Sequence, residues 1–212
     1  MSEKLWVGCL RVGPIETNCY ILKEGQEGKE AVLIDPGDEA ERILDALQTA
    51  GAEPSAILLT HGHYDHILAV NAIRDAYPSC RILAGELERP MLENSSLNTS
   101  FFRCDCVVTP DEYLADGQDI ELLGRTFRVL STPGHTAGSI CFYTEADGIL
   151  FSGDTIFCEG YGRTDLPTGS TKALMESLRT LLTTLPEETV ILPGHGGRTT
   201  VSHERLIEGF AL

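Results

Sequence analysis

The sequence predicts a mixed α/β (α+β) fold that contains antiparallel as well as parallel strands. Three observations lead to this class. Short apolar runs recur along the chain, amphipathic helical patterns lie between them, and no stretch rich in Pro, Gly or Ser is long enough to be a linker. A chain of 212 residues suits one domain, which would bury roughly 70% of its unfolded surface. We therefore expect residues 1–212 to form a single domain.

Eight apolar runs are the expected strands. In chain order they are Leu5–Val12, Cys19–Leu22, Ala31–Ile34, Ile57–Leu59, Phe127–Leu130, Ile140–Tyr143, Ile149–Phe151 and Val190–Leu192. An Asp-Gly pair at 147–148 favours a tight turn, so the sixth and seventh runs should form an antiparallel hairpin.

Three segments carry apolar residues at the spacing of one helix face. They contain Ala40, Ile43, Leu44 and Leu47; Ile67, Val70, Ile73 and Tyr77; and Leu174, Leu178, Leu181 and Leu182. Each predicts an amphipathic helix that packs on a sheet. The segment Asn94–Cys106 is polar and shows neither periodicity, so we expect a surface loop or a lid over a site.

The charge of the chain excludes some partners. Its 32 acidic and 16 basic side chains give a net charge of −16, which repels nucleic acid and anionic membrane surfaces. The basic residues form no patch. No segment approaches the roughly 18 to 20 apolar residues of a membrane-spanning helix. We therefore expect no nucleic-acid partner, no membrane and a small-molecule substrate.

The seven cysteines fit reduced thiols in the core better than a disulfide framework, which predicts a cytoplasmic protein. Cys104 and Cys106 are one residue apart and no second pair exists, so we do not expect them to bind a metal. Cys158 is expected to be a small buried residue.

A cluster of histidines directly follows the expected strand Ile57–Leu59. The segment His61-Gly62-His63-Tyr64-Asp65-His66 places three imidazoles and a carboxylate within six positions. Three later segments share one plan, an apolar strand, a glycine and then a potential ligand, which is His135, Asp154 or His195. Because glycine allows a sharp turn, the four strand ends can converge on one point. Only His203 lies outside these segments.

These seven residues predict a centre for two divalent metal ions. A buried cluster of imidazoles and carboxylates is costly without a cation, and seven ligands exceed the needs of one tetrahedral ion. Zinc is the expected ion, with iron or manganese as alternatives. A water that bridges two ions roughly 3.5 to 4 Å apart becomes a nucleophile near neutral pH, which favours hydrolysis. Asp154 stands alone after its glycine and is the expected bridging ligand, whereas Asp65 should bind one ion.

The order and spacing of these segments, from about Cys19 to His195, resemble the metallo-β-lactamase superfamily. The resemblance implies an αββα sandwich with the metals at the edge of the two sheets. It also implies the ligand sets: one ion held by His61, His63 and His135, the other by Asp65, His66 and His195, with Asp154 bridging.

Within this superfamily the chain is most similar to short, single-domain proteins of the glyoxalase II (hydroxyacylglutathione hydrolase) group. The segments at 13–20, 153–157 and 160–165 carry that similarity. It implies hydrolysis of a hydroxyacyl glutathione or related thioester by a metal-bridging hydroxide, with Asp65 and Asp154 as the catalytic carboxylates. Arg163 is the implied contact for glutathione, although pairing with Asp165 is an equal alternative. Tyr64 is a second candidate substrate contact, and Asp35 a candidate support for the His61 loop.

Two departures bear on the substrate. Larger glyoxalase II enzymes append a helical domain that completes the glutathione pocket, and too few residues follow His195 for such a domain. The acyl group and the binding of glutathione therefore stay open. True β-lactamases of the superfamily carry a thiolate at the position of Asp154, so β-lactam hydrolysis is not expected.

Two other functions remain as alternatives. A persulfide dioxygenase of the same fold would use one iron, held here by His63, His135 and Asp154. A non-catalytic module would keep the metals only to stabilise its fold. The sequence leaves the oligomeric state open.

Overall fold

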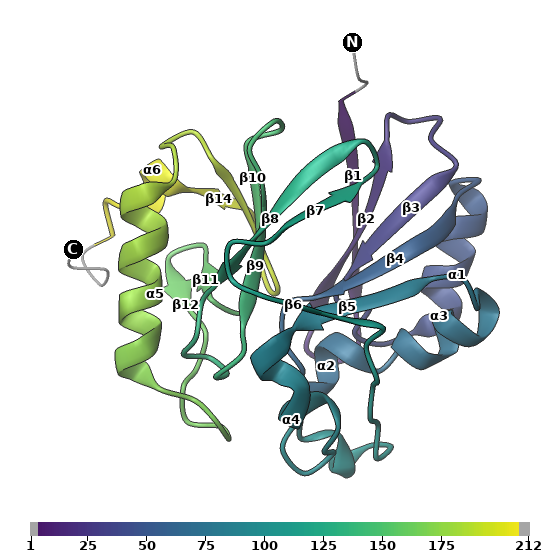
Figure 1. The fold of residues 1–212 in the computed structure, drawn as a ribbon, viewed down its shortest axis with the longest axis horizontal. Coiled ribbons are helices and arrows are strands. Elements are labelled where there is room, and N and C mark those ends of the chain that lie inside the picture. Colours follow the sequence, from purple (N-terminus) through teal and green to yellow (C-terminus); the bar gives the residue numbers. More distant parts are fainter. Residues whose placement is uncertain (1–3, 208–212) are drawn as a thin grey trace.

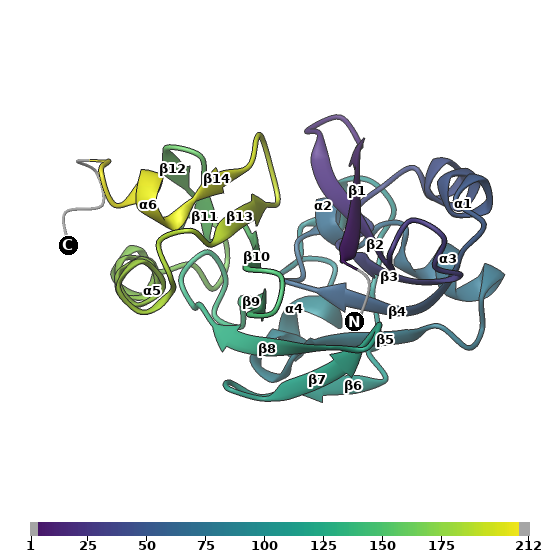
Figure 2. The same cartoon turned by 90° about the horizontal axis from the view of Figure 1, so that it is seen from above.

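Two β-sheets lie face to face at the centre of the molecule, and helices cover their outer sides (Figures 1 and 2). The structure is a computed structural model that describes residues 4–207. The arrangement is the expected αββα sandwich. It positions the ends of strands from both sheets along one edge.

The first sheet has the strand order β1-β2-β3-β4-β5-β6. β1, β2 and β3 pair in antiparallel fashion, whereas β3 to β6 run parallel. Their bounds are β1 Leu5–Val12, β2 Thr17–Glu24, β3 Glu30–Ile34, β4 Glu53–Leu59, β5 Arg81–Gly85 and β6 Glu112–Leu114.

The second sheet has the order β14-β13-β10-β9-β8-β7. Only the pair β10 and β13 is parallel. The bounds are β7 Asp119–Leu122, β8 Arg125–Ser131, β9 Ile140–Thr144, β10 Ile149–Gly153, β13 Val190–Pro193 and β14 Thr199–Thr200. A separate hairpin contains β11 Ile156–Phe157 and β12 Gly160–Tyr161.

The core between the sheets is built from alternating strand residues. Phe127, Phe142 and Phe151 come from the second sheet and are fully buried against Leu22 and Leu58 of the first. In β4 the neighbours of Leu58 belong to the other core, under the helices. Since successive side chains point to opposite faces, a strand covered on both sides reads as one continuous apolar run.

The helices that cover the sheets are α1 Ala40–Thr49, α2 Tyr64–Ile67, α3 Val70–Ala76, α4 Arg89–Leu92, α5 Thr171–Thr184 and α6 Val201–Glu204, with short 3₁₀ turns at Glu86–Glu88 and Ser100–Phe102. α1 and α3 pack on the first sheet through Ile43 and Ile73, and α5 packs on the second through Leu178. At the start of α5, the Ser170 hydroxyl accepts a hydrogen bond from the amide of Ala173 (3.3 Å).

Each of the eight predicted strands lies within an observed strand, and β9 and β10 form the predicted hairpin. The single helix predicted from Ile67 to Tyr77 is wrong, because it is divided into α2 and α3. Between them, the amide of Leu68 donates to the carbonyl of Gly37 and the amide of Ala69 donates to that of Pro36, both at 3.1 Å. These bonds to a neighbouring loop interrupt the helix.

The cysteines are only partly as expected. Four of them, Cys19, Cys80, Cys106 and Cys141, are buried free thiols. Cys9, Cys104 and Cys158 are exposed, so the prediction of a buried Cys158 is wrong. Cys158 lies in the two-residue turn between β11 and β12, where packing partners are few. Within residues 4–207, no helix is long and apolar enough to cross a membrane.

Candidate metal centre

The seven predicted ligands come together at one edge of the sandwich. β4, β8, β10 and β13 all end there, and each is followed within a few residues by a histidine or an aspartate. α2, at the lower end of the sheets in Figure 1, carries Asp65 and His66. Ligands separated by up to 134 residues in the sequence thus share one site because the strands that precede them end at the same edge.

His61, His63 and His135 form the first group of potential ligands. All three are buried, and one ligand atom from each lies within 4.8 Å of the others. Nδ1 of His63 is 2.8 Å from Nε2 of His135. Burial lowers the pKa of His63 to about 3 and that of His61 well below its usual value. Both rings are therefore neutral at pH 7, the form that binds a metal.

Asp65, His66 and His195 form the second group. Oδ2 of Asp65 lies 3.3 Å from Nε2 of His66 and 3.3 Å from Nε2 of His195. Two ligands bound at 2.0–2.1 Å to a tetrahedral ion are about 3.3–3.4 Å apart. The spacing of this group therefore suits a single small divalent ion.

Asp154 lies between the two groups. Its Oδ2 is 3.5 Å from Nε2 of His135 in the first group and 3.5 Å from Nε2 of His195 in the second. Its Oδ1 is 3.4 Å from Nε2 of His66. A Cβ atom on Gly194 would lie 2.2 Å from this oxygen, so only glycine fits beside the carboxylate. The carboxylate is in position to contact an ion in either group.

Several buried polar atoms of the site have no hydrogen-bond partner among the described residues. They are Nε2 of His61, His63 and His66, and Oδ1 of Asp154. Buried polar atoms are nearly always paired, and a cluster of unpaired donor atoms is costly. Bound cations would satisfy such a set, so the residues fit a centre for divalent metal ions.

Asp35 contacts two of the segments that carry the potential ligands. Its Oδ1 accepts a hydrogen bond from the amide of Thr60 (2.8 Å), and its Oδ2 accepts from the Thr60 hydroxyl (2.6 Å). The same Oδ2 lies 2.9 Å from Nδ1 of His66, which leaves Nε2 of that ring for the site. Asp35 therefore contacts the residue that precedes His61 as well as a ligand on α2.

Other hydrogen bonds fix the remaining ligands in a similar way. Nδ1 of His135 is 2.7 Å from the carbonyl of Arg163, and the Thr17 hydroxyl donates to Oδ2 of Asp65 (2.9 Å). The first bond leaves Nε2 of His135 for the centre, and the second holds the Asp65 carboxylate through the same oxygen that faces His66 and His195.

Glu88, a residue that the sequence did not point to, connects two ligand loops. It is fully buried after β5. Its Oε1 accepts a hydrogen bond from the amide of Gly62 (2.8 Å), and its Oε2 accepts from the Thr136 hydroxyl (2.9 Å). Burial raises the pKa of Glu88 to about 7. No motif or periodicity marks this position.

The two candidate substrate contacts lie at the surface. The Arg163 guanidinium is exposed and makes two hydrogen bonds of 2.7 Å to the carboxylate of Asp165. Tyr64 is partly exposed, and its amide donates to the carbonyl of Asn98 (2.9 Å). The segment Asn94–Cys106 thus lies against the turn that carries Asp65 and His66.

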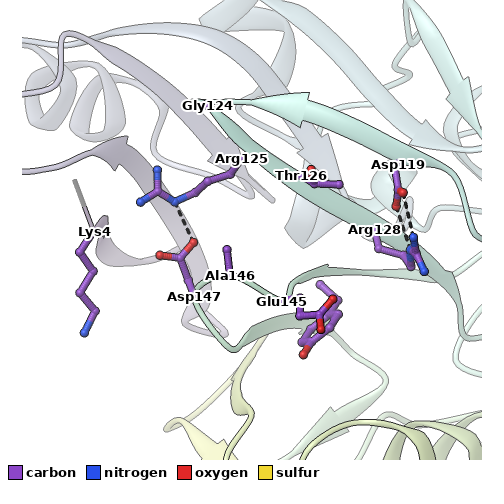
Figure 3. A pocket seen from close by; sticks show the side chains of 10 residues that line it. Lys4, Asp119, Gly124, Arg125, Thr126, Arg128, Glu145, Ala146 and Asp147 are labelled. Carbon is purple, nitrogen blue, oxygen red and sulfur yellow. Dashed lines mark hydrogen bonds and ion pairs between the residues drawn. The ribbon is translucent and has the colours of Figure 1, made fainter. Parts of the chain in front are cut away.

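A cavity of about 820 Å³ lies elsewhere, beside β7, β8 and the β9–β10 turn (Figure 3). Two of its three carboxylates form ion pairs, Asp147 with Arg125 at 2.7 Å and Asp119 with Arg128 at 2.8 Å. Asp147 precedes β10 and Asp154 follows it, so this cavity and the metal-ligand cluster lie at opposite ends of one strand. The cavity contains no histidine.

A two-sheet sandwich with histidines and aspartates gathered at its strand ends defines a class of metal-binding hydrolases. The chain belongs to the metallo-beta-lactamase superfamily, whose family model matches residues 12–195. The superfamily and the fold imply a metal-dependent hydrolase that binds divalent ions.

Two related sequences match over nearly their whole length. A probable metallo-hydrolase, YqgX, from Bacillus subtilis is 37% identical over 209 residues, which cover 95% of this chain and 97% of the relative. The hydroxyacylglutathione hydrolase GloC from Haemophilus influenzae is 32% identical over 197 residues, which cover 92% of each chain.

Two solved structures agree with the fold. A crystal structure of the B3 metallo-beta-lactamase BLEG-1 matches with a TM-score of 0.90 and 38% identity, over 97% of this chain and 99% of the other. A di-iron-bound structure of TTHA1623 matches with a TM-score of 0.85 and 39% identity, over 96% of this chain and the whole of the other.

Proposed function

We propose that the chain is a dinuclear metal-dependent hydrolase of the glyoxalase II type, which cleaves a hydroxyacyl glutathione or a related thioester. The position of Asp154 between two groups of three ligands carries this proposal, because a carboxylate placed there can contact two ions at once. The similarity to a hydroxyacylglutathione hydrolase supports the choice of substrate class.

His61, His63 and His135 would hold one ion, Asp65, His66 and His195 the other, and Asp154 would contact both. When bound, two divalent ions supply Lewis acidity and lower the pKa of water, which suits hydrolysis of an activated acyl bond. Zinc is the proposed ion. Iron accepts the same ligands, and the related di-iron-bound structure makes it the main alternative.

The chain itself orients the ligands and needs no acid for the leaving group. Asp35 and the carbonyl of Arg163 hold His66 and His135 by their second ring nitrogens. A thiol leaves readily as a thiolate, so no protonated side chain is required at the sulfur. This agrees with the first ligand group, in which burial lowers the pKa of His61, His63 and His135 below its usual value.

Arg163 is the proposed contact for a carboxylate of the glutathione part. Its pair with Asp165 is exposed, and exposed ion pairs contribute little to stability because solvent screens them. A substrate carboxylate could therefore displace Asp165 at little cost. Tyr64, which lies beside Asp65 and is partly exposed, is the second proposed contact.

Hydrolysis of β-lactams is the second candidate, because a structure 38% identical to this chain is that of a metallo-beta-lactamase. A one-iron persulfide dioxygenase is less well supported. It would use His63, His135 and Asp154 and leave Asp65, His66 and His195 without a role, although these three form a complete ligand group.

Elemental analysis of the purified protein, followed by three parallel assays, tests the proposal. The assays measure hydrolysis of lactoylglutathione, hydrolysis of a chromogenic cephalosporin, and oxygen uptake with glutathione persulfide. We expect about two metal equivalents per chain and turnover of the thioester. A metal-loaded sample that cleaves no acyl thioester would contradict the proposal, and the other two assays would then identify the reaction.

A further inference from the structure

A second group of potential metal ligands lies outside the candidate metal centre. Cys158, His203 and Glu204 each offer one ligand atom, and these atoms all lie within 4.8 Å of one another. Cys158 lies at the tip of the β11–β12 hairpin, and the other two residues are on α6. Figure 2 shows the hairpin next to α6, and the amide of Glu159 in the hairpin turn donates to the Glu204 carboxylate on α6.

The Glu204 carboxylate holds the tip of the hairpin. The amide of Glu159 donates to both of its oxygens, at 3.2 and 3.1 Å. Glu159 has a φ of 59°, in the left-handed region that non-glycine residues seldom adopt. The backbone is therefore held in an uncommon conformation that places Cys158 next to α6.

Glu204 is a buried carboxylate without a basic partner. It is fully buried, and besides the Glu159 amide it accepts only the Thr199 hydroxyl, at 2.5 Å. Within residues 4–207, no lysine or arginine forms an ion pair with it. Buried carboxylates are normally paired with a positive charge or bind a metal. A cation bound at this position would supply the missing charge.

The available donors are a thiol, an imidazole and a carboxylate. Cys, His and carboxylate side chains are all zinc ligands, and zinc sites with three protein ligands keep a fourth position open. A second carboxylate is close by as a possible fourth ligand, since Oε1 of Glu159 lies 3.2 Å from Nε2 of His203. A cavity of about 470 Å³, lined in part by Cys158 and His203, gives access from solvent.

We propose that Cys158, His203 and Glu204 form a peripheral binding site for zinc or another borderline divalent cation. On binding, the Cys158 thiol forms a sulfur–metal bond and releases its proton to water. His203 contributes a neutral ring nitrogen and Glu204 a carboxylate oxygen. No redox change or co-reactant is involved.

The site is also connected to the candidate metal centre. Phe157, next to Cys158, packs edge-on against the ring of His195, with 6.0 Å between the ring centroids. A cation at the hairpin tip would hold Phe157 in place beside that ligand.

Titration of the reduced, metal-free full chain with cobalt tests this proposal. A thiolate bound to cobalt gives an intense near-ultraviolet charge-transfer band that nitrogen and oxygen ligands do not give. The ligand set proposed for the hydrolytic centre contains no cysteine. The band therefore does not report on metal binding at that centre, and its presence does not depend on whether the proposed hydrolase activity is found. We expect the band to saturate at one thiolate-bound cobalt per chain, with release of one additional proton.

The intensity of the band should fall at least tenfold in the variant C158S. It should be unchanged in C104S, which removes another exposed thiol. The variant H203A should keep the thiol and raise the cobalt concentration at half-saturation at least tenfold. Circular dichroism of each variant checks that the fold is retained. Absence of the band in the unmodified chain, or its persistence in C158S, would overturn the proposal.

Discussion

The carboxylates at the two ends of the sandwich have different neighbours. Around the cavity in Figure 3, Asp147 and Asp119 are paired with Arg125 and Arg128. At the other end, Asp154 faces imidazoles, and its buried Oδ1 has no hydrogen-bond partner within residues 4–207. Arginine side chains offset both aspartates at the first end, whereas the second end presents buried donor atoms that would suit divalent cations. The donor atoms without hydrogen-bond partners, more than the size of a cavity, therefore identify the candidate site.

The largest effect is expected from removing the charge between the two ligand groups. The variant D154N should lower thioester hydrolysis on the order of 10³-fold, because loss of one electrostatic contact at a reaction centre has effects of this size. It should also reduce the metal content. The control is D119N, the same change at the opposite end, which should leave kcat/KM within about twofold. Equal losses of kcat/KM in D154N and D119N would contradict the proposed difference between the two ends.

Breaking the pair at the other end should affect stability without affecting the reaction. The variant D147N removes the carboxylate from a buried ion pair with Arg125, which should lower the free energy of unfolding by about 1.5–3 kcal/mol. Urea unfolding measures this loss. Under conditions where the variant is folded, its turnover should match that of the unmodified chain. Loss of metal from D147N would contradict the separation of the two ends.

The buried Glu88 predicts a dependence of stability on pH. Its pKa is about 7 in the folded protein against a usual 4.5, because burial disfavours the charged form. Between these values the folded state binds more protons than the unfolded state, so the stabilising contribution is present below pH 4.5 and is lost as pH rises through 7. The full difference amounts to about 3 kcal/mol.

The variant E88Q removes this titration, so its free energy of unfolding should change less between pH 5 and pH 8 than that of the unmodified chain. The exposed Glu93 provides the matched control, E93Q, which should keep the original slope. If the free energy of unfolding changed with pH to the same extent in the unmodified chain and in E88Q, Glu88 would not be the source of this pH dependence.

The smallest effect is expected from the support beneath the ligands. The variant D35N alters the group that holds Nδ1 of His66, and such changes typically weaken metal binding 10–100-fold. Competition with a chelator measures the affinity. D45N, at an exposed position on α1, is the control and should bind metal normally. An unchanged affinity in D35N would show that His66 is oriented without this bond.

The strands and the gathering of the seven candidate ligands at one edge were predictable because both follow from local sequence. β4 is covered on both faces and reads as an apolar run, and each late ligand follows a strand and a glycine. Glu88 was not predictable, since its partners Gly62 and Thr136 lie 26 and 48 residues away and only the fold brings them together. The break between α2 and α3 depends in the same way on a distant loop.

The central claim is that Asp154 contacts two metal ions held by the two ligand groups. A crystal structure of the metal-loaded chain, with anomalous scattering recorded at the absorption edge of the metal found by elemental analysis, tests it most directly. We predict two peaks in this centre, roughly 3.5–4 Å apart, with the Asp154 carboxylate in contact with both. A single peak bound by His63, His135 and Asp154, with Asp65, His66 and His195 free, would contradict the claim.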